Sequence, residues 1–532
     1  MARTGSPLAV LDTLGAFLTV LATLAAVTLA APRLRLPQPL ALALAGVGLA
    51  FVPAVRQLPI DPQWILVGFL PPLLYADAWQ TSWRDFGRWL RPILMLAVGL
   101  VAATILTVGL VAKWCLPQLP WAVCFLLGAI VSPTDTVAAQ AVLERLRVPR
   151  RITAILGGES LVNDATGLVG VQIAVAVVLH GAFEWGAVAA QFAWVAGGGV
   201  GLGLAVGALF AFAHAFVREP QPAFAVSLLA PYVAFALATV LGASGVLAVV
   251  VAGAFVAWRV HRIPPVARLP LRAAWSQVTF LLNGLCFLYI GRESPCLLAA
   301  AAEQQGLWRA GLWIGLAVIA TRLLWCWPNA YVPLWLWPKA RAREGGYPAP
   351  QGVALVSWCG VRGAVSLAAA LAVPTMAGDA PFPGRSEVVA CTLGVILLTL
   401  FVQGGTLFPL VRLLGLRDDG TTAAELRLAR ERLLQAGIAR LDAFCSERSC
   451  PVAVHRYREA MVDELASLRA DDAAERDRAG QRLAVSREVR GAVVAAQEVA
   501  LLRLRDAGGI DDEAYQKLLA DLDLARAEVG AG

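Results

Sequence analysis

GGESLVNDATGLVGVQIAVAVVL, residues 157–179, joins a polar first half to a second half that is apolar enough for lipid. Glu159, Asn163 and Asp164 lie in the first half, inside a run that otherwise reads as one helix from Thr153 to Leu179. Charge is expensive inside a bilayer, so ionisable residues within membrane spans are functional-site candidates by default. The stretch therefore predicts a membrane helix that carries a functional site.

The composition places the whole chain in a membrane. Of 532 residues, 58% are hydrophobic and only 15% are charged, whereas soluble domains are about a quarter charged. Apolar stretches of about 20 residues, the length that a bilayer requires of a helix, recur from Val10 to Leu414. They lack the alternation of outer-membrane strands. We therefore expect an all-α polytopic membrane protein.

Thirteen membrane spans are predicted, followed by a charged helical tail. The spans are 9–31, 38–55, 62–80, 91–113, 120–143, 153–180, 185–216, 222–241, 245–258, 273–291, 307–331, 352–376 and 387–413. The first reads as a true span because no strong cleavage signal follows it. The expected domains are a membrane domain, 1–416, and a cytoplasmic tail, 417–532.

Positive charge in the loops predicts the orientation. One set of alternate loops holds about three times as many Lys and Arg residues as the other, and cytoplasmic loops carry such an excess. With thirteen spans, the N-terminus lies outside and the tail inside. The net charge of +7 resides largely in these short loops. It therefore indicates the membrane topology and does not indicate nucleic-acid binding.

Six charged residues lie deep in the predicted spans: Asp77, Asp135, Glu159, Asp164, Arg322 and Arg362. Four acids face two bases, so at least one acid lacks a permanent partner. A carboxylate in a dry interior is stable when it holds a proton or a cation, since the bare charge is penalised. Such a group is a natural exchange site.

Helix geometry sorts the polar residues of the opening stretch. Ser160 and Asp164 are four residues apart and share one face, while Glu159 and Asn163 share a face turned by about 100°. One face can offer oxygens to a cation while the other is tied to the protein. All four residues could instead bridge helices. For Asn163, support of Asp164 and direct ligation of a cation both remain open.

Two spans are predicted to break near their middle. Pro133 and the polar residues around it interrupt GAIVSPTDTVAA, 128–139, because proline removes a backbone donor and clashes with the preceding turn. Thr134 can then offer a backbone or hydroxyl oxygen to a cation. Gly360 and Gly363 weaken the helix around Arg362 in SWCGVRGAVSLAAALAVP, 357–374.

The two interrupted spans are the fifth and the twelfth. Their offset of seven is an odd number, so the two helices run in opposite directions through the membrane. Interrupted segments at matching positions of two inverted six-helix repeats are a pointer to a transporter's midplane site. We expect Asp135 and Arg362 to compensate the facing half-helix ends. Asp135→Asn combined with Arg362→Ala should then harm transport less than the sum of the single changes.

These motifs resemble the monovalent cation/proton antiporter-1 family, the sodium/proton exchangers. The match rests on SPTDTVA (132–138), RLRVPRRITAILGGESLVNDATGLV (145–169), WCGVRGAVSLAAALAVP (358–374) and FVQGGTLFPLVRLLGL (401–416). GESLVNDA together with GVRGAV is highly specific. The resemblance implies a thirteen-helix fold and a homodimer in the lipid of a bacterial inner (plasma) membrane.

The resemblance also implies residue roles. Asp164 matches the carboxylate that carries Na⁺ and H⁺ in turn, and Asn163 completes an Asn-Asp pair that goes with electroneutral exchange. Ser160 and Thr134 match cation ligands. Glu159 and Arg322 match an ion pair that holds the core together, and Arg362 matches an arginine at the second break.

Two positions depart from the family pattern. The proline of the first break precedes Thr134, where members often read Thr-Asp-Pro. Ala76 stands where many members carry an acid, and Asp77 follows it, so Asp77 is only a candidate for the ion path.

The expected activity is electroneutral, one-for-one Na⁺/H⁺ antiport by alternating access, without a cofactor. A K⁺/H⁺ antiporter on the same scaffold and a cation channel are the alternatives. An intramembrane enzyme is disfavoured, because the four histidines show no metal spacing and no nucleophile–base pair.

Overall fold

The computed structural model describes residues 7–34, 36–56, 65–135, 137–146, 148–180, 185–303, 306–416, 420–447, 452–469, 491–504, 518–519, 521–522 and 525. The chain forms two compact units, Met1–Asp418 and Asp419–Gly532. Nearly all regular structure is helical, which confirms the prediction of an all-α protein.

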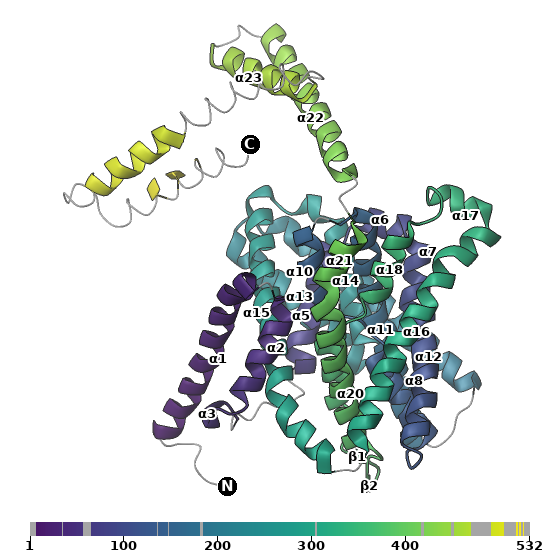
Figure 1. Cartoon of the computed structure of the whole chain (residues 1–532). Helices are drawn as coiled ribbons and strands as arrows, with labels where there is room; N and C mark the ends of the chain where they lie inside the picture. The colour runs from purple at the N-terminus through teal and green to yellow at the C-terminus, as the bar shows by residue number, and fades with distance from the viewer. Residues whose placement is uncertain are drawn as a thin grey trace. The chain divides into compact units, whose positions relative to one another are not determined.

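The first unit is a bundle of long apolar helices (Figure 1). The uninterrupted long helices are α1 (Pro7–Leu34), α11 (Arg150–His180), α12 (Trp185–Phe216), α13 (Pro220–Val240), α15 (Pro265–Glu303) and α16 (Leu307–Leu336). Shorter helices are α2 (Gln38–Leu49), α3 (Pro53–Arg56), α6 (Trp83–Arg88), α14 (Gly245–Trp258), η3 (Val260–Arg262) and α17 (Pro338–Arg343).

Several continuous helical segments contain a wider π-helical turn. They are η1 (Ile65–Phe69) with α5 (Leu70–Gln80); α7 (Leu90–Leu94), η2 (Met95–Leu100) and α8 (Val101–Cys115); and α20 (Arg385–Thr399), η4 (Leu400–Gly404) and α21 (Gly405–Leu414). The two-residue strands β1 (Met376–Ala377) and β2 (Ala380–Pro381) pair antiparallel before α20.

Two helices break where the sequence predicts. α9 (Trp121–Val131) and α10 (Val137–Leu146) flank the first break, and α18 (Pro350–Trp358) and α19 (Ala364–Leu371) flank the second. The breaks meet, because the Asp135 N–H donates to the Val361 carbonyl at 2.7 Å. Unsatisfied backbone at membrane depth is tolerated only where it is buried in protein or lines a cavity, and this contact satisfies part of it.

Within the described residues, eight helical segments are long and apolar enough to cross a membrane, judged by length and composition. α2, α9 and α14 are shorter apolar helices. The protein is thus a multi-pass membrane protein, while the count of thirteen spans remains a prediction. The predicted span 38–55 is too long, since α2 ends at Leu49 and Pro53 starts a separate turn. A helix usually ends before the residue that precedes a proline.

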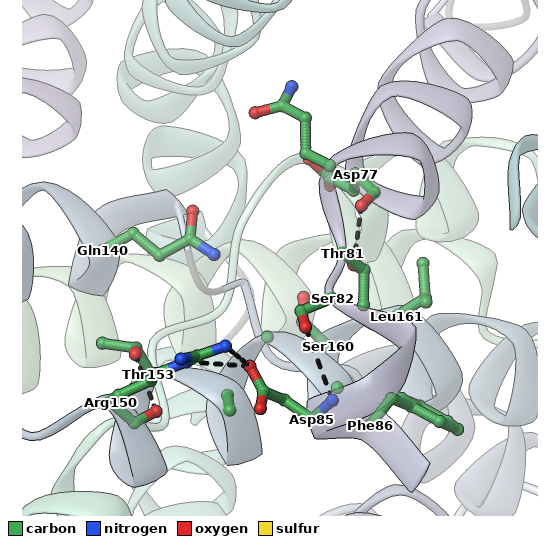
Figure 2. Close-up of a pocket in the computed structure, with 14 residues that line it drawn as sticks. Asp77, Thr81, Ser82, Asp85, Phe86, Gln140, Arg150, Thr153, Ser160 and Leu161 are labelled. Carbon is green, nitrogen blue, oxygen red and sulfur yellow. Dashed lines mark hydrogen bonds and ion pairs between the residues drawn. The ribbon is translucent and has the colours of Figure 1, made fainter. Parts of the chain in front are cut away.

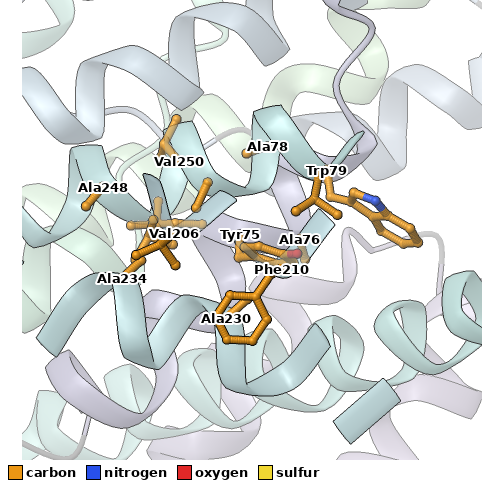
Figure 3. Packing of buried hydrophobic residues seen from close by; sticks show 14 of the residues in the cluster. Tyr75, Ala76, Ala78, Trp79, Val206, Phe210, Ala230, Ala234, Ala248 and Val250 are labelled. Carbon is orange, nitrogen blue, oxygen red and sulfur yellow. The ribbon is translucent and has the colours of Figure 1, made fainter. Parts of the chain in front are cut away.

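Small residues bring α12 and α14 close together. Gly199, Gly203 and Gly207 recur every four residues on α12, and a Cβ on Gly203 would come within 2.6 Å of the Ala248 carbonyl oxygen. Close backbone approach at small residues is a common means of helix packing in membranes. α5 and α13 complete this part of the core, which Figure 3 shows around Tyr75, Phe210 and Ala234.

The second unit contains two charged, largely exposed helices, α22 (Thr421–Glu447) and α23 (Val452–Arg469). Ion pairs join them: Arg430–Glu464 at 3.0 Å, Arg458–Asp442 at 2.6 Å and Arg469–Glu431 at 2.7 Å. All three pairs are substantially exposed, so each contributes little to stability.

Candidate functional site

The polar face of α11 lies at the first helix break. Glu159, Asn163 and Asp164 are 0%, 1% and 7% exposed. Most other residues in the middle and second half of the helix are apolar, so the buried polar groups must find partners inside the protein. The structure brings this face together with Thr134, which follows the end of α9.

Thr134 is the junction between the first break and α11. Its hydroxyl accepts a hydrogen bond from Asn163 Nδ2 at 2.7 Å and donates to Glu159 Oε1 at 3.1 Å. Its carbonyl oxygen accepts from Ser160 Oγ at 3.2 Å. Both oxygens of Thr134 are therefore already bonded to α11, and the carbonyl keeps a lone pair for another partner.

Glu159 forms a bidentate ion pair with Arg322 of α16. Arg322 Nη2 lies 2.8 Å from Glu159 Oε2, and Arg322 Nη1 contacts Glu159 Oε1. Arg322 also donates to the Val356 carbonyl near the end of α18, at 3.1 Å from Nε and 3.0 Å from Nη2. Both side chains are about 1% exposed, so the pair is buried and ties α11, α16 and α18 together.

Arg362 holds the carbonyl ends of two half-helices. Its Nε donates to the carbonyl of Val131, the last residue of α9, and its Nη1 donates to the Gly360 carbonyl beyond the end of α18, both at 2.7 Å. The C-terminal ends of helices attract cations. The backbone N–H of Arg362 donates to Thr399 Oγ1 of α20 at 3.1 Å.

Asp135 lies at the opposite kind of helix end. Gly363 is the N-cap of α19, and a Cβ on Gly363 would come within 2.6 Å of the Asp135 Cγ. A carboxylate is favoured near a helix N-terminus. The structure thus places Asp135 and Arg362 at half-helix ends of opposite polarity, and the predicted compensation between them stays a prediction.

Asp164 differs from the other buried acids. Its side chain is 7% exposed, and no hydrogen bond or ion pair joins its carboxylate to any residue that the structure describes. The Asn163 Oδ1 atom, on the adjacent residue, is buried and accepts no hydrogen bond from any described residue. Unpaired acceptor oxygens therefore gather at this point of α11.

A cavity of about 410 Å³ lies beside the first half of α11 (Figure 2). Its wall reaches Ser160, one helical turn before Asp164, and includes Asp77, Gln80 and Gln140. A neighbouring cavity of about 330 Å³ shares these last three residues. The Asp77 side chain is exposed, and no described residue bonds or pairs with its carboxylate.

The far wall of the first cavity carries an ion pair that the sequence analysis missed. Arg150, at the start of α11, contacts Asp85 Oδ2 at 2.8 Å from Nη2 and 2.9 Å from Nε. Arg150 lies in the loop predicted to be cytoplasmic, so this end of the cavity is the predicted cytoplasmic end. The pair joins α6 to α11 across 65 residues of sequence, which no local pattern reveals.

A multi-ligand metal centre is not found among the described residues, since no group of three or more His, Cys, Asp or Glu side chains could hold a metal ion. The oxygens near Asp164 come instead from one carboxylate, hydroxyls, an amide and a backbone carbonyl. Oxygen ligands suit hard cations.

The sequence matches a known family of membrane proteins. The profile of the sodium/hydrogen exchanger transmembrane family matches residues 18–413. The chain is 31% identical to an uncharacterized Na⁺/H⁺ exchanger, YjcE of Escherichia coli K12, over 96% of this chain and 97% of that one. It is 32% identical to a sodium, potassium, lithium and rubidium/H⁺ antiporter of Bacillus pumilus, over 76% of this chain and 62% of that one.

The fold is also that of a solved antiporter. The sodium/proton antiporter MjNhaP1 of Methanocaldococcus jannaschii superposes with a TM-score of 0.59 at 19% identity, covering 76% of this chain and all of that one. The proteins named here are exchangers or antiporters. The family profile and the near full-length relative together confirm the resemblance read from the motifs: the chain belongs to the sodium/hydrogen exchanger family and is a cation/proton antiporter.

Proposed function

We propose that this protein exchanges cytoplasmic Na⁺ for external H⁺, one for one, with Asp164 as the group that both ions share. The observation that carries the proposal is the buried Asp164 carboxylate without a partner among the described residues. Glu159 is held by Arg322, and Asp135 lies at a helix end. Asp164 is therefore the buried acid left for a transported ion.

The cycle follows from the cost of a bare charge. Ionised Asp164 binds Na⁺, with Ser160 and the Thr134 carbonyl as further oxygen ligands. After the cation leaves, Asp164 takes a proton. Both loaded forms cross without an uncompensated charge, whereas the empty carboxylate crosses rarely because a bare charge in a dry interior is strongly penalised. Exchange is thereby enforced and leak is suppressed.

Asn163 supports a stoichiometry of one to one. Its Nδ2 is bonded to Thr134 Oγ1 at 2.7 Å, and its neutral amide adds no second titratable charge beside Asp164. Only one charge is then neutralised, by either ion, in each half of the cycle. The unpartnered Asn163 Oδ1 leaves direct ligation of the cation open as a second role.

Asp77 belongs to the ion path in this proposal. It lies where the two cavities meet, and its exposed carboxylate can attract a hydrated cation before the cation reaches Asp164. A negative charge in a cleft raises the local cation concentration.

The membrane arrangement completes the proposal. The protein works as a homodimer in the bacterial inner membrane, with its N-terminus outside and the tail in the cytoplasm. The domains are 1–416 for exchange and 417–532 for the cytoplasmic tail. K⁺ in place of Na⁺ is the second candidate, because the Bacillus pumilus relative is named for four alkali cations.

Proteoliposomes test the function. A Na⁺, K⁺ or Li⁺ gradient is imposed, lumenal pH is read with a dye, and valinomycin with K⁺ sets the membrane potential in the Na⁺ and Li⁺ assays. In wild-type protein, protons should move in the direction opposite to the cation flow, with little response to the membrane potential. Asp164→Asn should show no exchange. Lower pH should raise the apparent KM for the cation, because a proton on Asp164 leaves no site for it.

Three results would count against the proposal. Strong dependence on potential would remove the one-for-one stoichiometry. Full activity of Asp164→Asn would remove the shared carrier. Simultaneous binding of Na⁺ and H⁺, without displacement of either, would remove the competition on which the cycle depends.

A further inference from the structure

Gln403 is a buried polar residue to which the proposed exchange cycle assigns no role. It lies in the π-helical turn η4, within the FVQGG motif, and is 1% exposed. π-helical turns inside α-helices often occur at functional sites. The turn places Gln403 next to the second helix break, because its Nε2 lies 3.2 Å from the position that a Cβ on Gly360 would take.

The Gln403 amide has no partner among the residues that the structure describes. Both Nε2 and Oε1 are buried and make no hydrogen bond to any of them. Buried polar atoms are nearly always hydrogen-bonded, and each exception needs an explanation. A leucine of similar size would fill the same space without this cost, so the amide is retained for something that bonds to it.

Arg362 carries a complementary unpartnered atom. Its Nε and Nη1 donate to backbone carbonyls, but its Nη2 is buried without a hydrogen-bond partner in the described part of the chain. Arg362 Nη1 bonds the Gly360 carbonyl at 2.7 Å, so the guanidinium and the Gln403 amide both lie against the same glycine. Arg362 Nη2 is thus a donor, and Gln403 Oε1 an acceptor, that no described residue uses.

We propose that Gln403 and Arg362 hold an ordered water between them, and that Gln403 is a positioning residue for the second helix break. The water accepts from Arg362 Nη2 and donates to Gln403 Oε1. Buried waters typically make about three such bonds to otherwise unpaired groups. Thr399 Oγ1 at the end of α20 accepts from the Arg362 N–H. The water adds a second attachment one turn later, at Gln403 in η4, so two successive turns hold the second break.

The consequence concerns the exchange rate, and in this respect the inference rests on the proposed function. Arg362 holds the ends of α9 and α18, so a loosely held guanidinium would loosen both breaks. Gln403 touches no transported ion. Its loss should therefore slow the conformational step and leave cation affinity almost unchanged.

The water can be detected without a transport assay. X-ray pulses generate hydroxyl radicals from bound waters, and these oxidise adjacent side chains that bulk solvent does not reach. Cys359 adjoins Gly360 and is 4% exposed, and Cys124 is 0% exposed; each belongs to an apolar cluster, so they differ in their distance from the second break rather than in apolar surroundings. In full-length protein in detergent, Cys359 should be labelled about fivefold faster than Cys124, and Gln403→Leu should remove the difference. Equal labelling of the two cysteines in wild-type protein overturns the water site.

Transport separates positioning from simple packing. Gln403→Leu should lower the maximal exchange rate about tenfold with KM for Na⁺ within about twofold. Gln403→Glu keeps an acceptor for Arg362 Nη2 and should restore both labelling and most of the rate. Thr392→Val is the matched control, because its hydroxyl is also buried and unpartnered but lies about two turns before Thr399.

Two outcomes would refute the positioning role: wild-type exchange by Gln403→Leu, or no rescue by Gln403→Glu. Asp164→Asn should abolish exchange yet leave the labelling of Cys359 unchanged. Failure of the shared-carrier mechanism and failure of the water site are therefore distinguishable.

Discussion

Glu159→Gln leaves the Arg322 guanidinium buried without its counter-charge. Both side chains are about 1% exposed and joined by two hydrogen bonds. Removing one partner of a buried ion pair costs about 3–5 kcal/mol. This corresponds to a decrease of roughly a hundredfold to several thousandfold in the folding equilibrium constant. The effect should be large because Arg322 also holds the Val356 carbonyl.

Two further variants test whether Glu159 and Arg322 stabilise the protein as a pair. In Glu159→Gln combined with Arg322→Met neither charge remains, so the double variant should be more stable than Glu159→Gln alone. Arg150→Gln is the control, because the Arg150–Asp85 pair is exposed to 37% and 15%. Exposed pairs contribute about 0–1 kcal/mol, so this change should be small.

Reversible unfolding in detergent mixtures, followed by tryptophan fluorescence, gives the free energy of unfolding for each variant. The reasoning would be refuted if the double variant were destabilised by the sum of the losses measured for Glu159→Gln alone and for Arg322→Met alone. It would equally be refuted if Glu159→Gln cost no more than Arg150→Gln.

Three other substitutions test the packing and the ion path. Gly360→Ala should lower both thermal stability and exchange, because its Cβ would come within 2.6 Å of the Arg322 Cδ; a melting curve and the pH-dye assay measure this. Gly203→Leu should cost several kcal/mol against the α14 backbone, whereas Gly201→Leu, with nothing within 4 Å of its Cβ position, should melt like wild type. Asp77→Asn should raise the apparent KM for cation supplied from the cavity side about threefold, and less at high salt, where charges are screened; oriented vesicles show whether the shift is confined to that side.

The sequence predicts the membrane class and both breaks because their causes are local. Apolar runs have the length of a bilayer, Pro133 cannot continue a helix, and glycines flank Arg362. The separation of the α11 polar residues into two faces also follows from helical spacing alone. The Glu159–Arg322 contact came instead from the resemblance, since its partners are 163 residues apart.

Other features escaped because they depend on neighbours distant in the chain. Gln403 is neutral, so a search for charged residues in apolar spans passed over it. The Asp85–Arg150 pair and the first cavity exist only once α5, α6, α10 and α11 pack together, and the second cavity also needs α2 and α15. The carbonyls chosen by Arg362 depend on how the two breaks meet, which no pattern within one span contains.

The bonds around Thr134 restrict which parts of the protein can slide during a transport cycle. Three hydrogen bonds tie this residue to α11, and the adjacent ion pair extends the connection to α16 and α18. Shearing through these contacts would break several buried polar bonds at once, at about 1–3 kcal/mol each. Contacts between hydrocarbon side chains lack such directional bonds and can shift past one another at lower cost. The surface along which parts of the protein slide should therefore run through apolar contacts outside this bonded group. Thr134, α11, α16 and α18 would then move together as a rigid body that contains the ion site.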